Sequence, residues 1–99
     1  MVIIIWQFEV RPEREEEFER VYGPSGAWAR LFKEGEGYIG TQLLRTVGTP
    51  TRHVTIDRWT TKEAYENFRK TRYAEYEKLD RVCENLTVTE VEIGSFERD

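Results

Sequence analysis

Cysteine, histidine and long apolar runs are all scarce in this sequence of 99 residues. The single cysteine, Cys83, cannot form a disulfide within the chain, which is typical of a reducing compartment, and we expect a cytoplasmic protein. His53 is the only histidine, so a zinc or non-haem iron site would depend on carboxylate ligands, and we expect no metal. No stretch approaches the roughly 20 apolar residues of a membrane helix, so we expect no membrane partner.

An excess of positive charge is also lacking. The chain has 15 Lys and Arg residues against 19 Asp and Glu residues, a net charge of −4, and its arginines form no basic block. Binding to nucleic acid requires a basic patch that contacts phosphates, so we expect no nucleic-acid partner. The acidic run 13–20 is typical of a solvated helix face.

Aromatic rings, in contrast, are plentiful, at 13% of the residues. The length of the chain suffices for one domain, which we expect to span 1–99. Large rings in the core of so small a domain indicate either a pocket for a ligand or an interface with a second copy of the chain.

Apolar periodicity and turn residues divide the chain into strands and helices. Strands are expected over 2–10, 38–46, 52–60 and 86–96, with a hairpin connection over 47–51. A first helix is expected over 13–22, followed by a short helical segment capped by Ser25. A long second helix is expected to begin at a capping box formed by Thr60 and Glu63 and to run as far as Asn85.

The order β-α-β-β-α-β predicts an α+β domain of the ferredoxin-like type, an antiparallel sheet with its helices on one face. The other face then has no cover within the chain, although strand 2–10 is apolar on both sides and Val54 and Ile56 form an apolar pair. A second copy is the economical cover, so we expect a homodimer through the helix-free sheet face. Trp6 and Phe8 are expected on that face.

A glycine pattern over 35–40 fits G-x-G-x-x-G, which in other proteins binds dinucleotides. That function needs a strand before the glycines and a helix after them, so that the helix N-terminus meets the pyrophosphate. Here a helix is expected before the pattern and a strand after it. The pattern therefore predicts turns, and no nucleotide cofactor is expected.

The third expected strand carries the most polar candidate for an inward face. His53, Asp57 and Trp59 lie at odd positions along it, so their side chains point to one side. On the first strand, Ile3, Ile5 and Gln7 form the corresponding set. If both sets face the helices, they enclose a cavity lined by Gln7, Asp57, Trp59, Trp28, Phe32 and Tyr65.

Two interpretations of the polar residues stay open at this point. In an apolar cavity, desolvation would raise the pKa of Asp57 and its carboxylate would act as a base, or Asp57 pairs with an arginine such as Arg72. His53 either serves as the base or lies in water near the start of its strand. Arg72, on the apolar stripe of the second helix, either binds an anionic ligand group or extends its charged head into solvent.

Three segments of the chain together resemble a known family. They are residues 36–40 (EGYIG), residues 54–59 (VTIDRW) and, after a capping threonine, residues 63–68 (EAYENF). In a chain of this length and element order they resemble the antibiotic biosynthesis monooxygenase family. The resemblance covers nearly the whole chain and implies a dimeric α+β barrel.

The resemblance implies two chemistries. Some members of the family oxidise polycyclic phenols or quinols with O₂, without metal or flavin, which implies a cofactor-independent monooxygenase acting on a small aromatic molecule. Under this hypothesis Trp59 and Trp28 stack on the ligand. Asp57 or His53 removes a proton from it, and Gln7, Arg72 or Tyr65 orients the oxygen atoms.

Other members bind and degrade haem with an Asn on the first strand, a Trp after the third strand and a His on the second helix. Trp59 matches the Trp and Gln7 stands near the Asn position, but the second helix contains no histidine, so the axial iron ligand is missing. A haem-binding protein is therefore one alternative. The other is a non-catalytic dimeric module, for ligand binding or stress, whose cavity is filled by its own rings.

Overall fold

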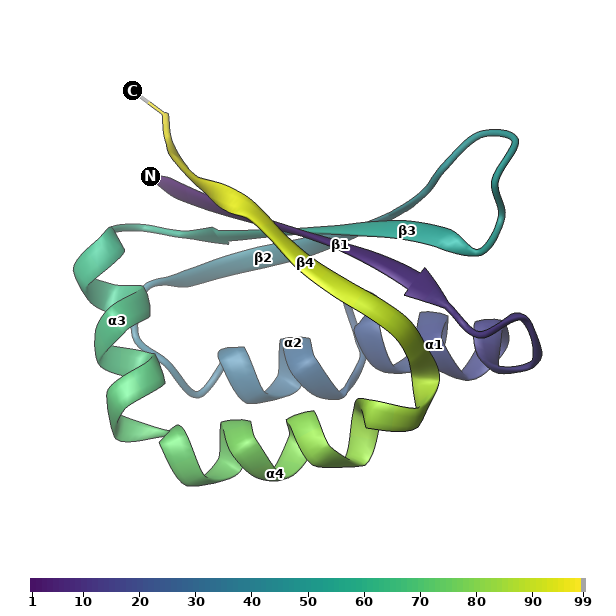
Figure 1. Ribbon diagram of the computed structural model, residues 1–99. Helices are drawn as coiled ribbons and strands as arrows, with labels where there is room; N and C mark the ends of the chain where they lie inside the picture. The colour runs from purple at the N-terminus through teal and green to yellow at the C-terminus, as the bar shows by residue number, and fades with distance from the viewer. Residues whose placement is uncertain (99) are drawn as a thin grey trace.

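A computed structural model describes residues 1–98 as a four-stranded antiparallel sheet with helices on one face (Figure 1). The strands are β1 (Val2–Val10), β2 (Tyr38–Arg45), β3 (Arg52–Trp59) and β4 (Thr87–Glu97), in the sheet order β2-β3-β1-β4. The helices are α1 (Glu15–Tyr22), α2 (Ala27–Phe32), α3 (Lys62–Thr71) and α4 (Tyr73–Cys83), with short 3₁₀ turns at Pro12–Arg14 and Glu84–Leu86. The predicted ferredoxin-like α+β fold is confirmed.

The pairing of β1 with β3 decides which side chains face the helices. Ile4 pairs with Asp57, Trp6 with Thr55 and Phe8 with His53, and all of these β3 residues are buried under the helices. The helix-facing set on β1 is therefore Val2, Ile4, Trp6, Phe8 and Val10. The expected sides of β1 were wrong: Trp6 and Phe8 face the helices, and Ile3, Ile5 and Gln7 face away.

The long second helix of the prediction is interrupted. Arg72 adopts φ −113° and ψ 28°, which ends α3, and α4 continues from Tyr73 in a new direction (Figure 1). The helix also begins one residue later than expected, at the N-cap Thr61, whose side chain accepts a hydrogen bond from the backbone N–H of Ala64 at 3.0 Å. Thr60 still continues the sheet, since its N–H donates to the carbonyl of Gly37 at 2.7 Å, and this occupied N–H leaves no donor for the Glu63 side chain that a capping box requires.

The core between sheet and helices is largely aromatic. Trp59 is completely buried and lies edge-on to Phe32, Tyr38 and Tyr65, with ring centroids 5.3–5.9 Å apart. Gly35 packs directly against this cluster, since a Cβ at its position would lie 2.8 Å from a ring carbon of Phe68. The aromatic rings and the backbone of Gly35 thus fill this end of the core.

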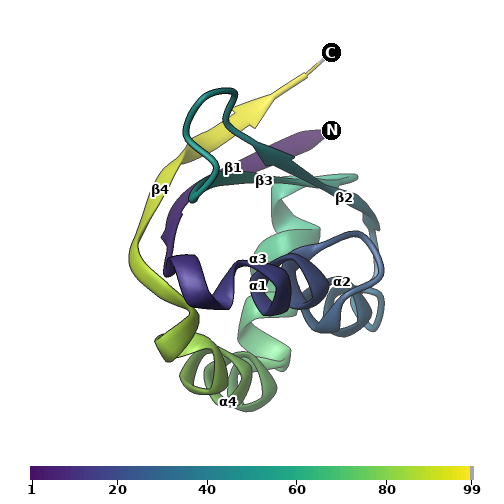
Figure 2. The same cartoon turned by 90° about the vertical axis from the view of Figure 1, so that its right-hand side faces the viewer.

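The second face of the sheet carries no helix (Figure 2). Several apolar residues on this face are about half exposed, including Leu44, Val91 and Phe96. The predicted bare face is therefore present in the single chain. Among residues 1–98, no helix is long and apolar enough to cross a membrane.

Candidate functional site

A cavity of about 180 Å³ lies between the sheet and the helices. Its floor is aromatic and its polar groups come from the middle of the sheet and from the rim; the lining residues are Trp6, Phe8, Tyr22, Trp28, Phe32, Thr41, Thr55, Asp57, Arg69, Tyr76, Glu77, Asp80 and Glu90. A cavity of roughly 150 Å³ is known to hold a benzene molecule. The space here suits an aromatic ligand of one or two rings, and the protein's own rings do not fill it.

Asp57 is the buried acid of this cavity. It lies near the end of β3 opposite Thr41 of β2, whose hydroxyl donates a hydrogen bond of 2.6 Å to its carboxylate. The Tyr38 hydroxyl lies 2.6 Å from the same Thr41 oxygen and donates to it, because the Thr41 proton is committed to Asp57. The three side chains therefore form a short hydrogen-bonded chain that ends at the carboxylate.

Burial raises the pKa of Asp57 from 3.8 to about 6, against the hydrogen bond from Thr41, which lowers it. An acid with this pKa is mostly ionised at neutral pH, yet it holds a proton more strongly than an ordinary aspartate does. These are the properties of a general base that works near neutral pH. Of the two interpretations of Asp57, the cavity carboxylate is the one that the structure shows, since Arg72 bonds instead to Glu34 at 2.6 Å.

Arg69 is the cation of the cavity, a role that the sequence suggested for Arg72. Its guanidinium group donates to the Tyr65 hydroxyl at 2.8 Å and lies 3.9 Å from the centre of the Tyr76 ring. Burial raises the pKa of both tyrosines, so they stay protonated near neutral pH. Tyr65 and Arg69 are four residues apart on α3, and this i, i+4 relation is the signal that could have identified Arg69; Tyr76 meets them from α4, across the break at Arg72.

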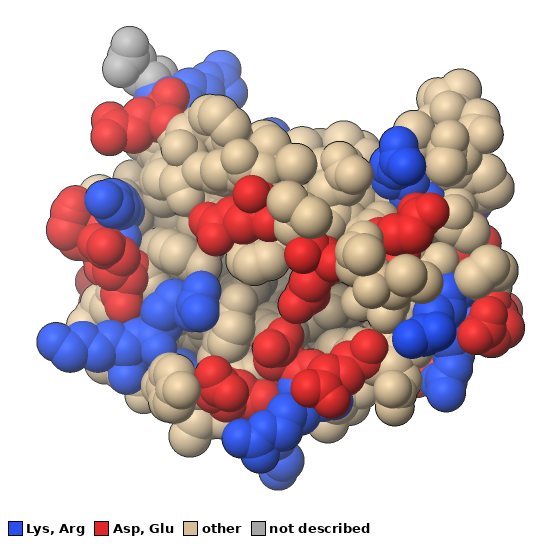
Figure 3. Space-filling view, in the orientation of Figure 1, with Lys and Arg blue, Asp and Glu red and all other residues tan. Residues whose placement is uncertain are grey.

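The rim of the cavity is acidic. Burial and the nearby Asp80 raise the pKa of Glu90, and burial together with Glu77 and Glu84 raises that of Asp80. Figure 3 shows acidic side chains gathered around the hollow between β4 and α4. The rim was not predicted from the sequence, because its members come from α4 and β4, which no local pattern connects.

The structure brings only some of the predicted site residues together. Asp57, Trp28 and Phe32 line the cavity as expected. Gln7 lies on the opposite face of the sheet, where it pairs with Val54, because β1 is turned the other way from the prediction. Trp59 is enclosed by other rings, and Tyr65 reaches the cavity only through Arg69.

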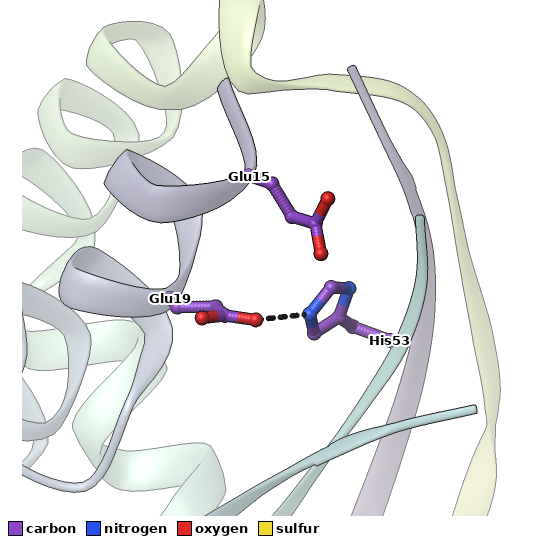
Figure 4. Close-up of side chains that lie close together, drawn as sticks. All are labelled: Glu15, Glu19 and His53. Atoms are coloured by element: carbon purple, nitrogen blue, oxygen red, sulfur yellow. Dashed lines mark hydrogen bonds and ion pairs between the residues drawn. The ribbon is translucent and has the colours of Figure 1, made fainter. Parts of the chain in front are cut away.

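His53 belongs to a different cluster. It is completely buried, so the interpretation that places it in water was wrong, and its Nε2 lies 2.9 Å from a carboxylate oxygen of Glu19 (Figure 4). It contributes nothing to the lining of the cavity, which removes it as a base for a ligand bound there.

Haem does not fit this site. Pockets for ligands of drug size or larger have about 300–1,000 Å³, whereas this cavity has about 180 Å³. Its lining, within residues 1–98, also includes no histidine that could serve as the axial ligand.

Comparison with known proteins places the chain in a family. Residues 1–76 match the family model described as antibiotic biosynthesis monooxygenase. The sequence has no significant match among curated proteins. The fold is similar to that of a candidate antibiotic biosynthesis monooxygenase from Deinococcus radiodurans, at 11% identity and a TM-score of 0.79 over 100% of this chain and 93% of the other.

Two further solved structures share the fold. One is a candidate monooxygenase of the same description from Bordetella bronchiseptica, with 23% identity and a TM-score of 0.77 over 99% of this chain and 96% of the other. The second is SnoaB, a cofactor-independent oxygenase from Streptomyces nogalater, with 22% identity and a TM-score of 0.73 over 99% of this chain and 92% of the other. The chain belongs to the antibiotic biosynthesis monooxygenase family.

Proposed function

We propose that the protein is a cofactor-independent monooxygenase that oxidises a small aromatic hydroxyl compound with O₂. The observation that carries the proposal is a carboxylate with a raised pKa, Asp57, in the wall of an aromatic cavity that fits one or two rings. The family match and the similarity to SnoaB, a cofactor-independent oxygenase, support the same reaction class.

In this mechanism the Asp57 carboxylate accepts the hydroxyl proton of the bound phenol. The phenolate that forms is electron-rich and reduces O₂ by one electron, and the two radicals combine at a ring carbon as a peroxide anion. Asp57 returns its proton to this anion, which becomes a hydroperoxide. Loss of the hydrogen on that carbon together with cleavage of the O–O bond gives a quinone and one molecule of water. The substrate supplies all the electrons, so one oxygen atom of O₂ enters the quinone and the other leaves as water.

The rest of the cavity suits this sequence of steps. Among residues 1–98, Arg69 is the one lysine or arginine in the lining of the cavity, and its guanidinium group stabilises the phenolate. The rim carboxylates of Glu77, Asp80 and Glu90 repel anions, so the preferred substrate is a neutral phenol that becomes charged only after it has entered. The aromatic floor, including Trp28 and Phe32, provides the surface on which the substrate ring stacks.

The test is O₂ consumption with 1-naphthol, a neutral bicyclic phenol whose oxidation would yield 1,4-naphthoquinone. The wild-type protein should consume one O₂ per quinone formed, and ¹⁸O₂ should label one quinone oxygen. Asp57→Asn should abolish this uptake, whereas Glu16→Gln, a charge-removing change on the exposed side of α1, should retain it. Quenching of tryptophan fluorescence by 1-naphthol without any O₂ consumption would indicate a ligand-binding module instead.

We also propose that a second copy of the chain covers the helix-free sheet face. Ile3, Ile5, Val54 and Ile56 form a partly exposed apolar centre on this face, with Leu44, Val91 and Phe96 around it. An apolar face of this kind on a small protein indicates an interface, and a two-fold axis would pair it with itself.

Light scattering coupled to size exclusion tests the dimer. The wild-type mass should be twice 11.8 kDa. Ile56→Glu should shift it towards the monomer, and the matched change Val47→Glu, in a loop side chain that is 97% exposed, should not. A monomeric wild-type protein would contradict the proposal.

A further inference from the structure

His53, Glu15 and Glu19 form a cluster at the opposite end of β3 from Trp59, outside the cavity described above (Figure 4). One potential ligand atom from each residue lies within 4.8 Å of those of the other two. The two glutamates are four residues apart on α1, so they share the face that meets β3. No local sequence pattern connects this set, because His53 follows Glu19 by 34 residues in the chain.

The burial of His53 is the second observation. Its side chain is completely buried, its Nε2 points to Glu19, and its Nδ1 has no hydrogen-bond partner among residues 1–98. The imidazole therefore has no polar contact outside the cluster, although a buried polar ring is costly without partners. The His53 ring is thus already held in place beside two carboxylates. A neutral imidazole is a common metal ligand.

The two carboxylates already attract a cation. An Nη atom of Arg45 lies 3.8 Å from an oxygen of Glu15 and 3.8 Å from an oxygen of Glu19. These distances are too long for hydrogen bonds, and the Arg45 side chain is 59% exposed. Arg45 thus balances the negative charge loosely and is free to turn towards solvent when another cation binds.

We propose that this cluster binds one divalent transition-metal ion, for which Zn²⁺ is the probe. The ligands are Nε2 of His53 and one oxygen each from Glu15 and Glu19, which is a nitrogen and carboxylate set that Zn²⁺ accepts. Three protein ligands leave one position for water. The ion would join α1 to β3, and since none of its ligands lines the cavity, the site does not depend on the proposed oxidation.

Isothermal titration of the metal-free, tag-free protein with ZnCl₂ tests the site. The wild-type protein should bind one ion per chain. Glu15→Gln should weaken binding by at least about tenfold, because the loss of even a residue that only orients a metal ligand lowers affinity by about 10- to 100-fold. Glu16→Gln is the matched control, because it removes the same charge from a neighbouring side chain that is 94% exposed, and it should leave the affinity unchanged. Arg45→Gln should tighten binding several-fold, since it removes the competing cation.

A spectroscopic measurement identifies the ligands independently. Co²⁺ bound to the wild-type protein should give visible ligand-field absorption, which His53→Gln should abolish. If His53→Gln fails to fold, Glu15→Gln carries the same test, because the Glu15 side chain makes no hydrogen bond within residues 1–98 and its contact with Arg45 at 3.8 Å is loose. No saturable binding, or equal affinities for Glu15→Gln and Glu16→Gln, would overturn the proposal.

Discussion

Replacement of Asp57 by Asn should raise the free energy of unfolding relative to the wild type, and this gain should be larger at high pH than at low pH. The raised pKa of Asp57 means that the folded state binds this proton more tightly than the unfolded chain does. The protonated acid thus stabilises the fold at low pH, and this contribution is lost as the pH rises from about 4 to above 6. Asn resembles the protonated acid at every pH.

The magnitude follows from the pKa. A rise from 3.8 to about 6 corresponds to about 3 kcal/mol, at ~1.36 kcal/mol for each pH unit. At pH 8 the wild-type protein bears this whole cost of a buried charge, whereas at pH 4 most of the carboxyl groups at this site are protonated in the folded state. The stability difference between variant and wild type should therefore change by about 2–3 kcal/mol between the two pH values.

Urea unfolding at pH 4 and pH 8, at one protein concentration, measures this change. A fixed concentration is needed because association would add to the apparent stability. The comparison between the two proteins cancels the titration of the other carboxyl groups, which affects both equally. A difference that is the same at both pH values would refute the assignment of a raised pKa to Asp57.

Three further substitutions test parts of the structure. Thr41→Val removes the hydrogen bond that lowers the pKa of Asp57, so carboxyl NMR should find this pKa above about 6; an unchanged value would show that Thr41 does not donate to it. Thr61→Ala removes the N-cap of α3 and should cost about 1 kcal/mol in urea unfolding. Gly26→Ala would bring a Cβ within 2.2 Å of the Val21 carbonyl oxygen and should cost about 2 kcal/mol or more; Gly40→Ala, with nothing within 4 Å, should cost nothing and is the control.

Element order could be predicted from the sequence, but the side of β3 that faces the helices could not. The period of two divides the β3 residues into two sets, one with His53 and Asp57 and one with Val54 and Ile56, and only the folded structure shows that the first set lies under the helices. On β1 both sides are apolar, so the sequence does not indicate which side faces the helices. The pairing of Phe8 with His53 and of Trp6 with Thr55 in the folded sheet determines that side. The error over Gln7 follows from that one ambiguity.

The candidate site was predictable to the extent that single elements determine it. Asp57 was recognised because it is a carboxylate on a buried face, and Trp28 and Phe32 because they lie on an apolar helical stripe. The choice of Arg72 over Arg69 failed because the helix breaks at Arg72, which redirects this side chain to Glu34. Partners from separate elements, such as Thr41 for Asp57 and Glu19 for His53, have no signature in the sequence.

Whether Asp57 is the base of an oxidising cavity can be decided by the pH dependence of O₂ consumption with 1-naphthol. We expect kcat/KM of the wild-type protein to rise with an apparent pKa near 6, the value for the buried carboxylate in the free protein. Asp57→Asn should have no activity above the spontaneous oxidation at any pH. Equal activity and the same pH profile in the two proteins would contradict this role of Asp57.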